Sequence, residues 1–101
     1  MAWALFSIAS TKKAEIDAAL ADDVVSRQSH KVRAAAALGG PADRTYVLVE
    51  GAPEAVRRAE ELLGPLGDRP AASDAAELYR KFKDEEDAAS AGMGLFFGDD
   101  A

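Results

Sequence analysis

The 101-residue sequence contains no cysteine and a single histidine, His30. The absence of cysteine excludes disulfides, thiolate metal ligands and a cysteine nucleophile. One histidine cannot form a histidine-rich metal cluster, and the spacings GxSxG, HExxH and that of an EF-hand loop are also missing. Acid–base chemistry would need His30 beside an acid such as Asp43 or Glu50. We therefore expect no catalytic residue, no metal and no cofactor, and the sequence favours a binding module over an enzyme.

Long apolar runs are also lacking. The run at residues 2–9, AWALFSIA, is too short to span a membrane and is not preceded by the basic segment of a secretory signal. We therefore expect a cytoplasmic protein without membrane contact. The length suits one domain with a modest hydrophobic core.

Negative charge is concentrated toward the C-terminus. The net charge is −6, and residues 71–101 hold eight of the 18 acidic residues but only three of the 12 basic ones. Residues 1–70 are therefore close to neutral. The acidic end argues against contact with nucleic-acid phosphates there, whereas the body could carry local patches of either sign.

Hydrophobic periodicity predicts alternating strands and helices. The segment 27–38 is ambiguous, because alanine favours a helix while the following Gly39-Gly40 favours the first arm of a hairpin. We interpret it as a strand. The expected elements are a strand at 2–9, a helix at 12–23 with its stripe at Ile16, Leu20 and Val24, a strand at 27–38, a strand at 45–51, a helix at 52–64, and a helix capped by Ser73.

This order predicts an α+β fold of the ferredoxin-like type, βαββα, with a short antiparallel sheet, a C-terminal helix and an acidic tail. A complete fold of that type needs a fourth strand, for which LGPLGDRP is a poor match. The sheet therefore has either three strands or a short, irregular fourth one. We divide the chain into an α+β domain at 1–67, a linker and helix at 68–83, and a tail at 84–101.

The large apolar residues of these elements are the expected core. In the strand at 45–51, alternation makes Tyr46 with Leu48 and Val47 with Val49 two competing inward sets. The candidate core residues are Trp3, Phe6, Ile8, Ile16, Leu20, Tyr46, Leu48, Val56 and Leu63.

A basic segment, SRQSHKVR, is the first candidate site. On a strand, Arg27, Ser29, Lys31 and Arg33 would share one face, which could bind a phosphate or an RNA backbone. His30 would then point to the opposite face. The simpler interpretation is a solvated polar strand face without a ligand.

The C-terminal stretch DEEDAASAGMGLFFGDD is the second candidate site. Acidic and small residues keep such a segment in solution, while an apolar cluster lies between glycines. Met93, Phe96 and Phe97 have the spacing i, i+3, i+4 of a helix that binds in a groove. The candidate partner-binding residues are Met93, Leu95, Phe96 and Phe97.

The acidic run, the Ala/Ser/Gly stretch and GMGLFFG resemble the C-terminal tail of archaeal and eukaryotic acidic ribosomal stalk proteins. The resemblance is confined to about residues 84–98. In that family the terminal hydrophobic residues recruit translational GTPases, so the resemblance implies this role for the same four residues. Two other interpretations stay open: Leu95 to Phe97 fold back as a last strand of the sheet, or the tail has no partner.

Three functions are therefore compatible with the sequence. The favoured one is a non-enzymatic protein-interaction module that uses the tail, with a translational GTPase as a possible partner. The second is a small-ligand, phosphate or RNA-binding regulatory domain that uses residues 27–33. The third is a structural subunit of a homo-oligomer.

Overall fold

The computed structural model describes the backbone of residues 1–98 and the side chains of residues 1–85. The chain divides into two compact units, Met1–Ala71 and Ala72–Ala101. The first unit contains a four-stranded antiparallel sheet with helices α1 (Lys13–Leu20) and α2 (Pro53–Leu63). The second contains helix α3 (Ala72–Gly98). The chain is therefore an α+β protein with three α-helices in its described part.

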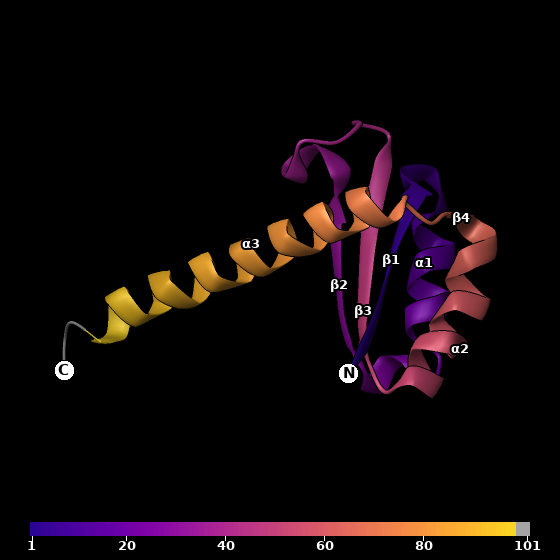
Figure 1. The fold of residues 1–101 in the computed structure, drawn as a ribbon, viewed down its shortest axis with the longest axis horizontal. Helices are drawn as coiled ribbons and strands as arrows, with labels where there is room; N and C mark the ends of the chain where they lie inside the picture. The colour runs from indigo at the N-terminus through magenta and orange to yellow at the C-terminus, as the bar shows by residue number, and fades with distance from the viewer. Residues whose placement is uncertain (99–101) are drawn as a thin grey trace. The chain divides into compact units, whose positions relative to one another are not determined.

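The four strands are β1 (Ala2–Ala9), β2 (Ser29–Ala34), β3 (Arg44–Gly51) and β4 (Gly67–Asp68), and their order across the sheet is β2-β3-β1-β4 (Figure 1). All three pairings are antiparallel. Strand β4 is only two residues long and pairs with Ser7 and Ile8 of β1. Of the two alternatives that the sequence left open, the sheet therefore has the short fourth strand.

Helices α1 and α2 pack on the same face of the sheet, which we call the helix face (Figure 1). Ile16 and Leu20 of α1, and Val56, Ala59 and Leu63 of α2, contribute the helical part of the core. Because side chains alternate along a strand, every second residue of β1 and β3 joins them. The strand residues of this core are Ala4, Phe6, Ile8, Val47 and Val49.

The predicted core is correct for all but one residue. Trp3, which lies near the start of β1 on the face opposite Phe6 and Ile8, is 37% exposed. Both candidate inward sets of β3 are buried, on opposite faces of the strand. Val47 and Val49 belong to the helix-face core, while Tyr46 and Leu48 are also buried, on the other side of the strand.

The first helix is shorter than predicted. It ends at Leu20, and its predicted third stripe residue, Val24, is 42% exposed, while Val25 is fully buried. Neither Ser10 nor Thr11 caps the helix with its side chain; a 3-10 turn at Ser10–Lys12 precedes it, and Ser10 Oγ instead lies 3.0 Å from Thr45 Oγ1.

Two further boundaries differ from the prediction. Strand β2 covers Ser29–Ala34, and the following alanines form a 3-10 turn at Ala35–Leu38 that ends at Gly39. Gly39 has a φ of 82°, which glycine adopts without the steric cost of other residues. Helix α3 begins at Ala72, one residue before Ser73, and continues through the charged and small residues to Gly98.

Candidate functional site

The sheet has a second face, opposite the helix face, on which polar and apolar side chains mix. Strand β2 contributes Ser29, Lys31 and Arg33 to it, as alternation predicts. Cross-strand register places Lys31 beside Leu48 and Arg33 beside Tyr46. We define the second face by its strand residues: Trp3, Leu5, Ser7, Ser29, Lys31, Arg33, Tyr46, Leu48 and Glu50.

The structure does not bring Arg27 to this face. Arg27 ends a 3-10 turn at Val25–Arg27, two residues before β2 begins. Its Nη2 lies 3.4 Å from Asp23 Oδ1, and both side chains are largely exposed. The predicted four-residue basic row is therefore reduced to Ser29, Lys31 and Arg33.

The two cations that remain on the second face are only partly exposed. Arg33 is half-buried and its Nη1 donates to the main-chain carbonyl of Val32 at 2.9 Å. Lys31 is half-buried, and its Nζ atom is shielded from solvent. A bound anion would therefore have to replace the contact of Arg33 with the Val32 carbonyl and reach the shielded Nζ of Lys31.

Other cations of the first unit lie against carboxylates. Arg58 Nη2 is 3.1 Å from Asp22 Oδ1, and Arg69 Nη1 is 2.7 Å from Glu60 Oε2. Neutralised cations attract phosphates weakly, because the nearby carboxylate cancels most of the field. Further pairs of this kind are Lys13 with Asp17, Arg27 with Asp23, Arg44 with Asp68, and Arg58 with Glu61.

His30 has neither of its proposed acid partners. It is exposed and stands opposite Val49, on the helix-face side of β2. Glu50 projects to the second face, because it is the next residue along β3. Asp43 lies at the other end of the β2–β3 hairpin, where its main-chain carbonyl accepts from Ser10 N–H at 2.9 Å. The acid–base pair considered from the sequence is therefore not formed.

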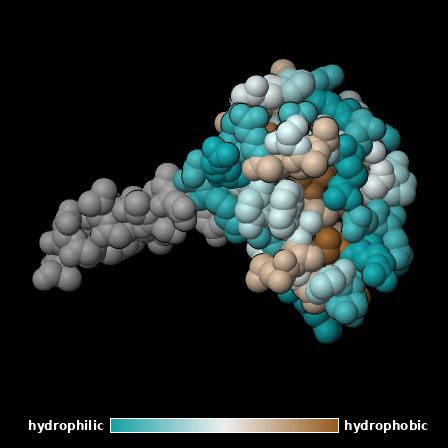
Figure 2. Space-filling model, in the orientation of Figure 1, coloured by the Kyte–Doolittle hydropathy of each residue, from teal (hydrophilic) through white to brown (hydrophobic). Residues whose placement is uncertain are grey.

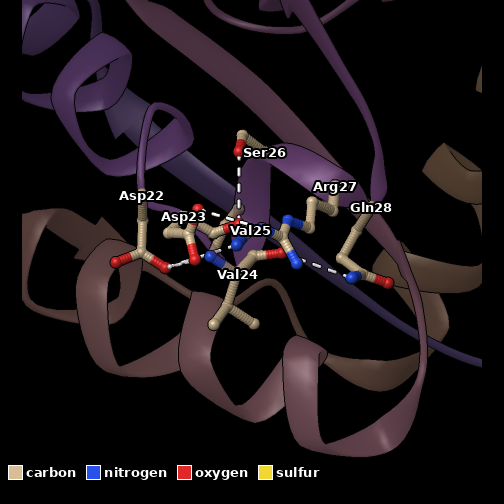
Figure 3. Close-up of polar contacts among 7 residues, drawn as sticks. All are labelled: Asp22, Asp23, Val24, Val25, Ser26, Arg27 and Gln28. Atoms are coloured by element: carbon tan, nitrogen blue, oxygen red, sulfur yellow. Dashed lines mark hydrogen bonds and ion pairs between the residues drawn. The ribbon is translucent and has the colours of Figure 1, made fainter.

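Asp22 organises the turn between α1 and β2 (Figure 3). Its Oδ2 accepts from the main-chain N–H groups of Val24 at 3.1 Å and Val25 at 3.3 Å, and its Oδ1 accepts from Arg58. The hydrogen bond from Arg58, followed by those from the main chain, lowers the pKa of Asp22, while partial burial opposes the shift. The same contact raises the pKa of Arg58.

The rest of this turn is closed by its own hydrogen bonds. Figure 3 shows Ser26 Oγ donating to the Asp23 carbonyl at 3.4 Å and Gln28 Nε2 donating to the Val24 carbonyl at 3.2 Å. Gln28 Oε1 also accepts from Ala52 N–H at 3.4 Å, at the start of α2. This arrangement holds the turn against α2, and we assign it a structural role.

The tail residues fall partly outside the described part of the chain. Helix α3 includes Met93, Leu95, Phe96 and Phe97 within its bounds, but their side chains lie outside the described residues, as does the whole of 99–101. The residues 95–97 are therefore helical in backbone and do not form a strand of the sheet.

Among residues 1–85, no group of three or more histidine, aspartate or glutamate side chains could hold a metal ion. In the same described region, no helix combines the length and apolar character that crossing a membrane would require. On the side of the molecule drawn in Figure 2, hydrophilic residues predominate and hydrophobic ones form only small areas.

One feature that sequence reasoning missed is the burial of Glu50. It is 6% exposed, and it is the only charged residue in that class among the described residues. The only signal for it was its place in the apolar strand TYVLVEG.

No protein-family model matches the sequence, and neither a curated protein nor a solved structure matches it.

Proposed function

We propose that this protein is a non-enzymatic interaction module that binds a protein partner through its C-terminal segment. The observation that carries the proposal is the division of the chain into a sheet-containing unit, Met1–Ala71, and a separate unit that holds the acidic and apolar segment. The acidic and apolar segment belongs to the second of these units.

The strand pairing and the core of the first unit support this proposal. A fourth strand, Gly67–Asp68, already pairs with β1 at Ser7 and Ile8, and residues 95–97 lie within helix α3. The helix-face cluster is formed, among the described residues, by side chains between Ala2 and Leu66. Both observations weigh against the interpretation in which the tail folds back as a strand.

The charges of the first unit weigh against the RNA or phosphate-binding alternative. Arg27 pairs with Asp23, Arg33 donates to a main-chain carbonyl, and Lys31 Nζ is shielded from solvent. Phosphate binding relies on cations that exchange counterions for the ligand. A basic row with these contacts is a poor candidate for such exchange, so we prefer the tail as the binding element.

The sequence of the tail supports a translational GTPase as the partner. GMGLFFG after an acidic run resembles the factor-recruiting tail of ribosomal stalk proteins. Helix α3 includes Met93, Phe96 and Phe97, whose spacing is that of groove-binding helices. Binding of this kind is transient, because ordering entropy offsets part of the contact energy.

A direct binding measurement tests this proposal. The full chain is titrated with a purified translational elongation GTPase by calorimetry, and the Phe96→Ser/Phe97→Ser double variant is titrated alongside. We expect binding by the wild type and loss of binding by the double variant. The matched control is Val24→Ser, which replaces a 42% exposed apolar residue in the first unit and should bind normally.

Thermal melts of the same double variant separate this proposal from a structural role of the tail. We expect the melting temperature to stay nearly unchanged. Two aromatics buried on the domain would instead contribute several kcal/mol, and their loss would lower the melting temperature by many degrees. Normal binding of the GTPase by the double variant, or no binding by the wild type, contradicts the proposal.

We also propose the finer assignment of the first unit to the ferredoxin-like arrangement. The element order strand, helix, strand, strand, helix, strand supports it, as does the antiparallel pairing of β1 with both β3 and β4. Nuclear Overhauser contacts between Ser7 and Asp68 in solution would test the β1–β4 pairing, and their absence would leave a three-stranded sheet.

A further inference from the structure

A three-residue segment at the β1 edge of the sheet, Gly67–Arg69, is held mainly by charged side chains, and we call it the strap. Its first two residues form β4 and pair with Ser7 and Ile8 of β1. The preceding residue, Leu66, packs against the helix-face core, and its main-chain carbonyl accepts from Lys12 Nζ at 3.3 Å. The chain is therefore anchored at Leu66, and the strap begins directly after this anchor.

Both charged side chains of the strap reach other elements of the first unit. Asp68 Oδ2 lies 3.4 Å from Arg44 Nη2 on β3, and Arg69 Nη1 lies 2.7 Å from Glu60 Oε2 on α2. The Arg69 guanidinium also lies over the ring of Phe6 on β1, with 5.2 Å between its Cζ and the ring centroid. Phe6 belongs to the helix-face core, so Arg69 covers a core residue at the sheet edge.

These contacts are weak ones, because most of the groups that make them remain in water. The Asp68 side chain is 85% exposed, that of Arg69 is 48% exposed and that of Glu60 is 44% exposed. Exposed ion pairs contribute little to stability, and dissolved salt screens them. The strap itself, with the sequence GDR, carries no apolar side chain that could enter the core. Its attachment is therefore weaker than that of β1 and β3, whose alternate residues fill the core.

Gly67 allows the close approach of the strap to β1. A Cβ at this position would collide with the Ser7 carbonyl oxygen and would lie 2.9 Å from the Cα of Ile8. Both atoms belong to the main chain of β1, so neither can turn aside as the end of a side chain can. A residue with a Cβ would therefore hold the strap away from β1.

We propose that the strap is a salt-sensitive closure of the sheet edge, which detaches from β1 while the rest of the first unit stays folded. Detachment uncovers the ring of Phe6 and the edge of β1 at Ser7 and Ile8. High ionic strength favours the detached state, because it screens the ion pairs that hold the strap. Such a local opening costs less free energy than global unfolding, since it breaks few buried contacts. The device does not depend on the C-terminal segment of the proposed function, so the two proposals fail independently.

Amide hydrogen exchange of the full chain, followed residue by residue by NMR, tests this proposal. We expect the amides that bond β1 to β4 to exchange faster than those of Val47 and Val49 in β3. Between about 0.01 M and about 1 M sodium chloride, the Debye length falls from about 30 Å to about 3 Å. Exchange of the β1–β4 amides should then rise about two- to tenfold, while exchange at Val47 and Val49 stays unchanged.

Two variants isolate the contacts that hold the strap. Arg69→Gln removes the cation, so exchange of the β1–β4 amides should rise about two- to tenfold at low salt and should respond less to added salt. Arg57→Gln, at an exposed position of α2, is the matched control and should leave this exchange unchanged. Gly67→Ala should raise the same exchange at low and high salt alike, without a change in the amides of β3.

The Arg69 side chain supplies a second readout, because protons held over an aromatic ring resonate upfield of their usual position. Its δ-methylene protons should move downfield as salt is added and in Gly67→Ala. Exchange of the β1–β4 amides only through global unfolding would overturn the proposal. Exchange that responds neither to salt nor to Arg69→Gln would overturn it as well. If Gly67→Ala fails to fold by circular dichroism, Arg69→Gln and the salt titration decide the outcome.

Discussion

Arg44 of β3 makes two hydrogen bonds to Ser7 of the neighbouring strand β1. Its Nη2 donates to the Ser7 carbonyl at 2.7 Å and its Nε donates to Ser7 Oγ at 3.1 Å. Nη2 also lies 3.4 Å from Asp68 Oδ2 in β4. Three strands thus meet at one guanidinium, beside the shortest strand of the sheet.

We expect Arg44→Lys to lower the free energy of unfolding by about 1–3 kcal/mol, because an ammonium cannot reproduce the forked donors. Urea denaturation measures the change. Arg57→Lys, at an exposed position of α2, serves as the control and should change stability by less than about 0.5 kcal/mol. Equal effects of the two substitutions would show that the contacts with Ser7 contribute nothing specific.

Phe6 is 1% exposed and belongs to the helix-face core. Phe6→Ala should cost about 3–5 kcal/mol, through lost burial and the cavity left behind. The exposed Val24 supplies the comparison, since Val24→Ala should cost less than about 0.5 kcal/mol. A loss below about 1 kcal/mol for Phe6→Ala in denaturant melts would mean that β1 does not hold Phe6 in a packed core.

The contact between Asp22 and Arg58 predicts a pH-dependent contribution to stability. The pKa of Asp22 is lowered below its ordinary value of 3.8 in the folded chain. A carboxyl with a lowered folded pKa stabilises the fold above its unfolded pKa, and this contribution is lost as the pH falls through the folded pKa. Asp22→Asn should therefore be less stable than wild type at neutral pH, with a gap that narrows below pH 3.8.

Chemical denaturation at several pH values measures this gap. Asp23→Asn is the matched control, because the Asp23 side chain is 86% exposed and its contact is with the exposed Arg27 four residues on. A gap of constant size across the acid range would assign the effect of Asp22→Asn to something other than its charge.

Gly40 lies against the hydroxyl of Tyr46, which a Cβ at this position would meet in the present geometry. Gly40→Ala should therefore destabilise the domain, and adding Tyr46→Phe should restore part of the loss by removing the hydroxyl. Gly64→Ala is the contrasting case. Its Cβ would meet nothing within 4 Å and its backbone is helical, so the change should be neutral or stabilising by up to about 1 kcal/mol. Thermal melts of the wild type, Gly40→Ala, Gly40→Ala/Tyr46→Phe and Gly64→Ala measure these differences in stability.

The elements with strong local signals were predictable. AWALFSIA and TYVLVEG are rich in aromatic and β-branched residues, and both are strands of nearly the predicted length. Pro53 and Gly64 bracket α2 at the predicted place, because proline suits the first helical turn and glycine its end.

The sequence-based prediction is wrong at positions where contacts with residues distant in sequence determine the local structure. Val24 continued the helical spacing of Ile16 and Leu20, but Asp22 accepts hydrogen bonds from the turn and from Arg58 on α2, so the chain leaves the helix and Val25 is buried instead. Arg27 is excluded from β2 by the same turn. No local pattern contains the position of Arg58, so these outcomes could not be derived from spacing alone.

The candidate site was predictable to a similar degree. Alternation along β2 correctly joined Ser29, Lys31 and Arg33 on one face. The shielding of Lys31 Nζ and the burial of Glu50 depend on the neighbouring strands, which alternation along β2 does not describe. The role proposed for Phe96 and Phe97 stays a prediction.

The central place of β1 in the sheet bears on how the chain folds during synthesis. Its partners come late, since Ala9 pairs with Arg44 and Ala2 with Gly51. Contacts between residues so far apart in sequence form slowly, because a long loop must close before they can form. A ribosome makes the N-terminus first, at about 5–20 residues per second. For several seconds, then, the apolar strand at residues 2–9 has been made while the strand that pairs with it has not.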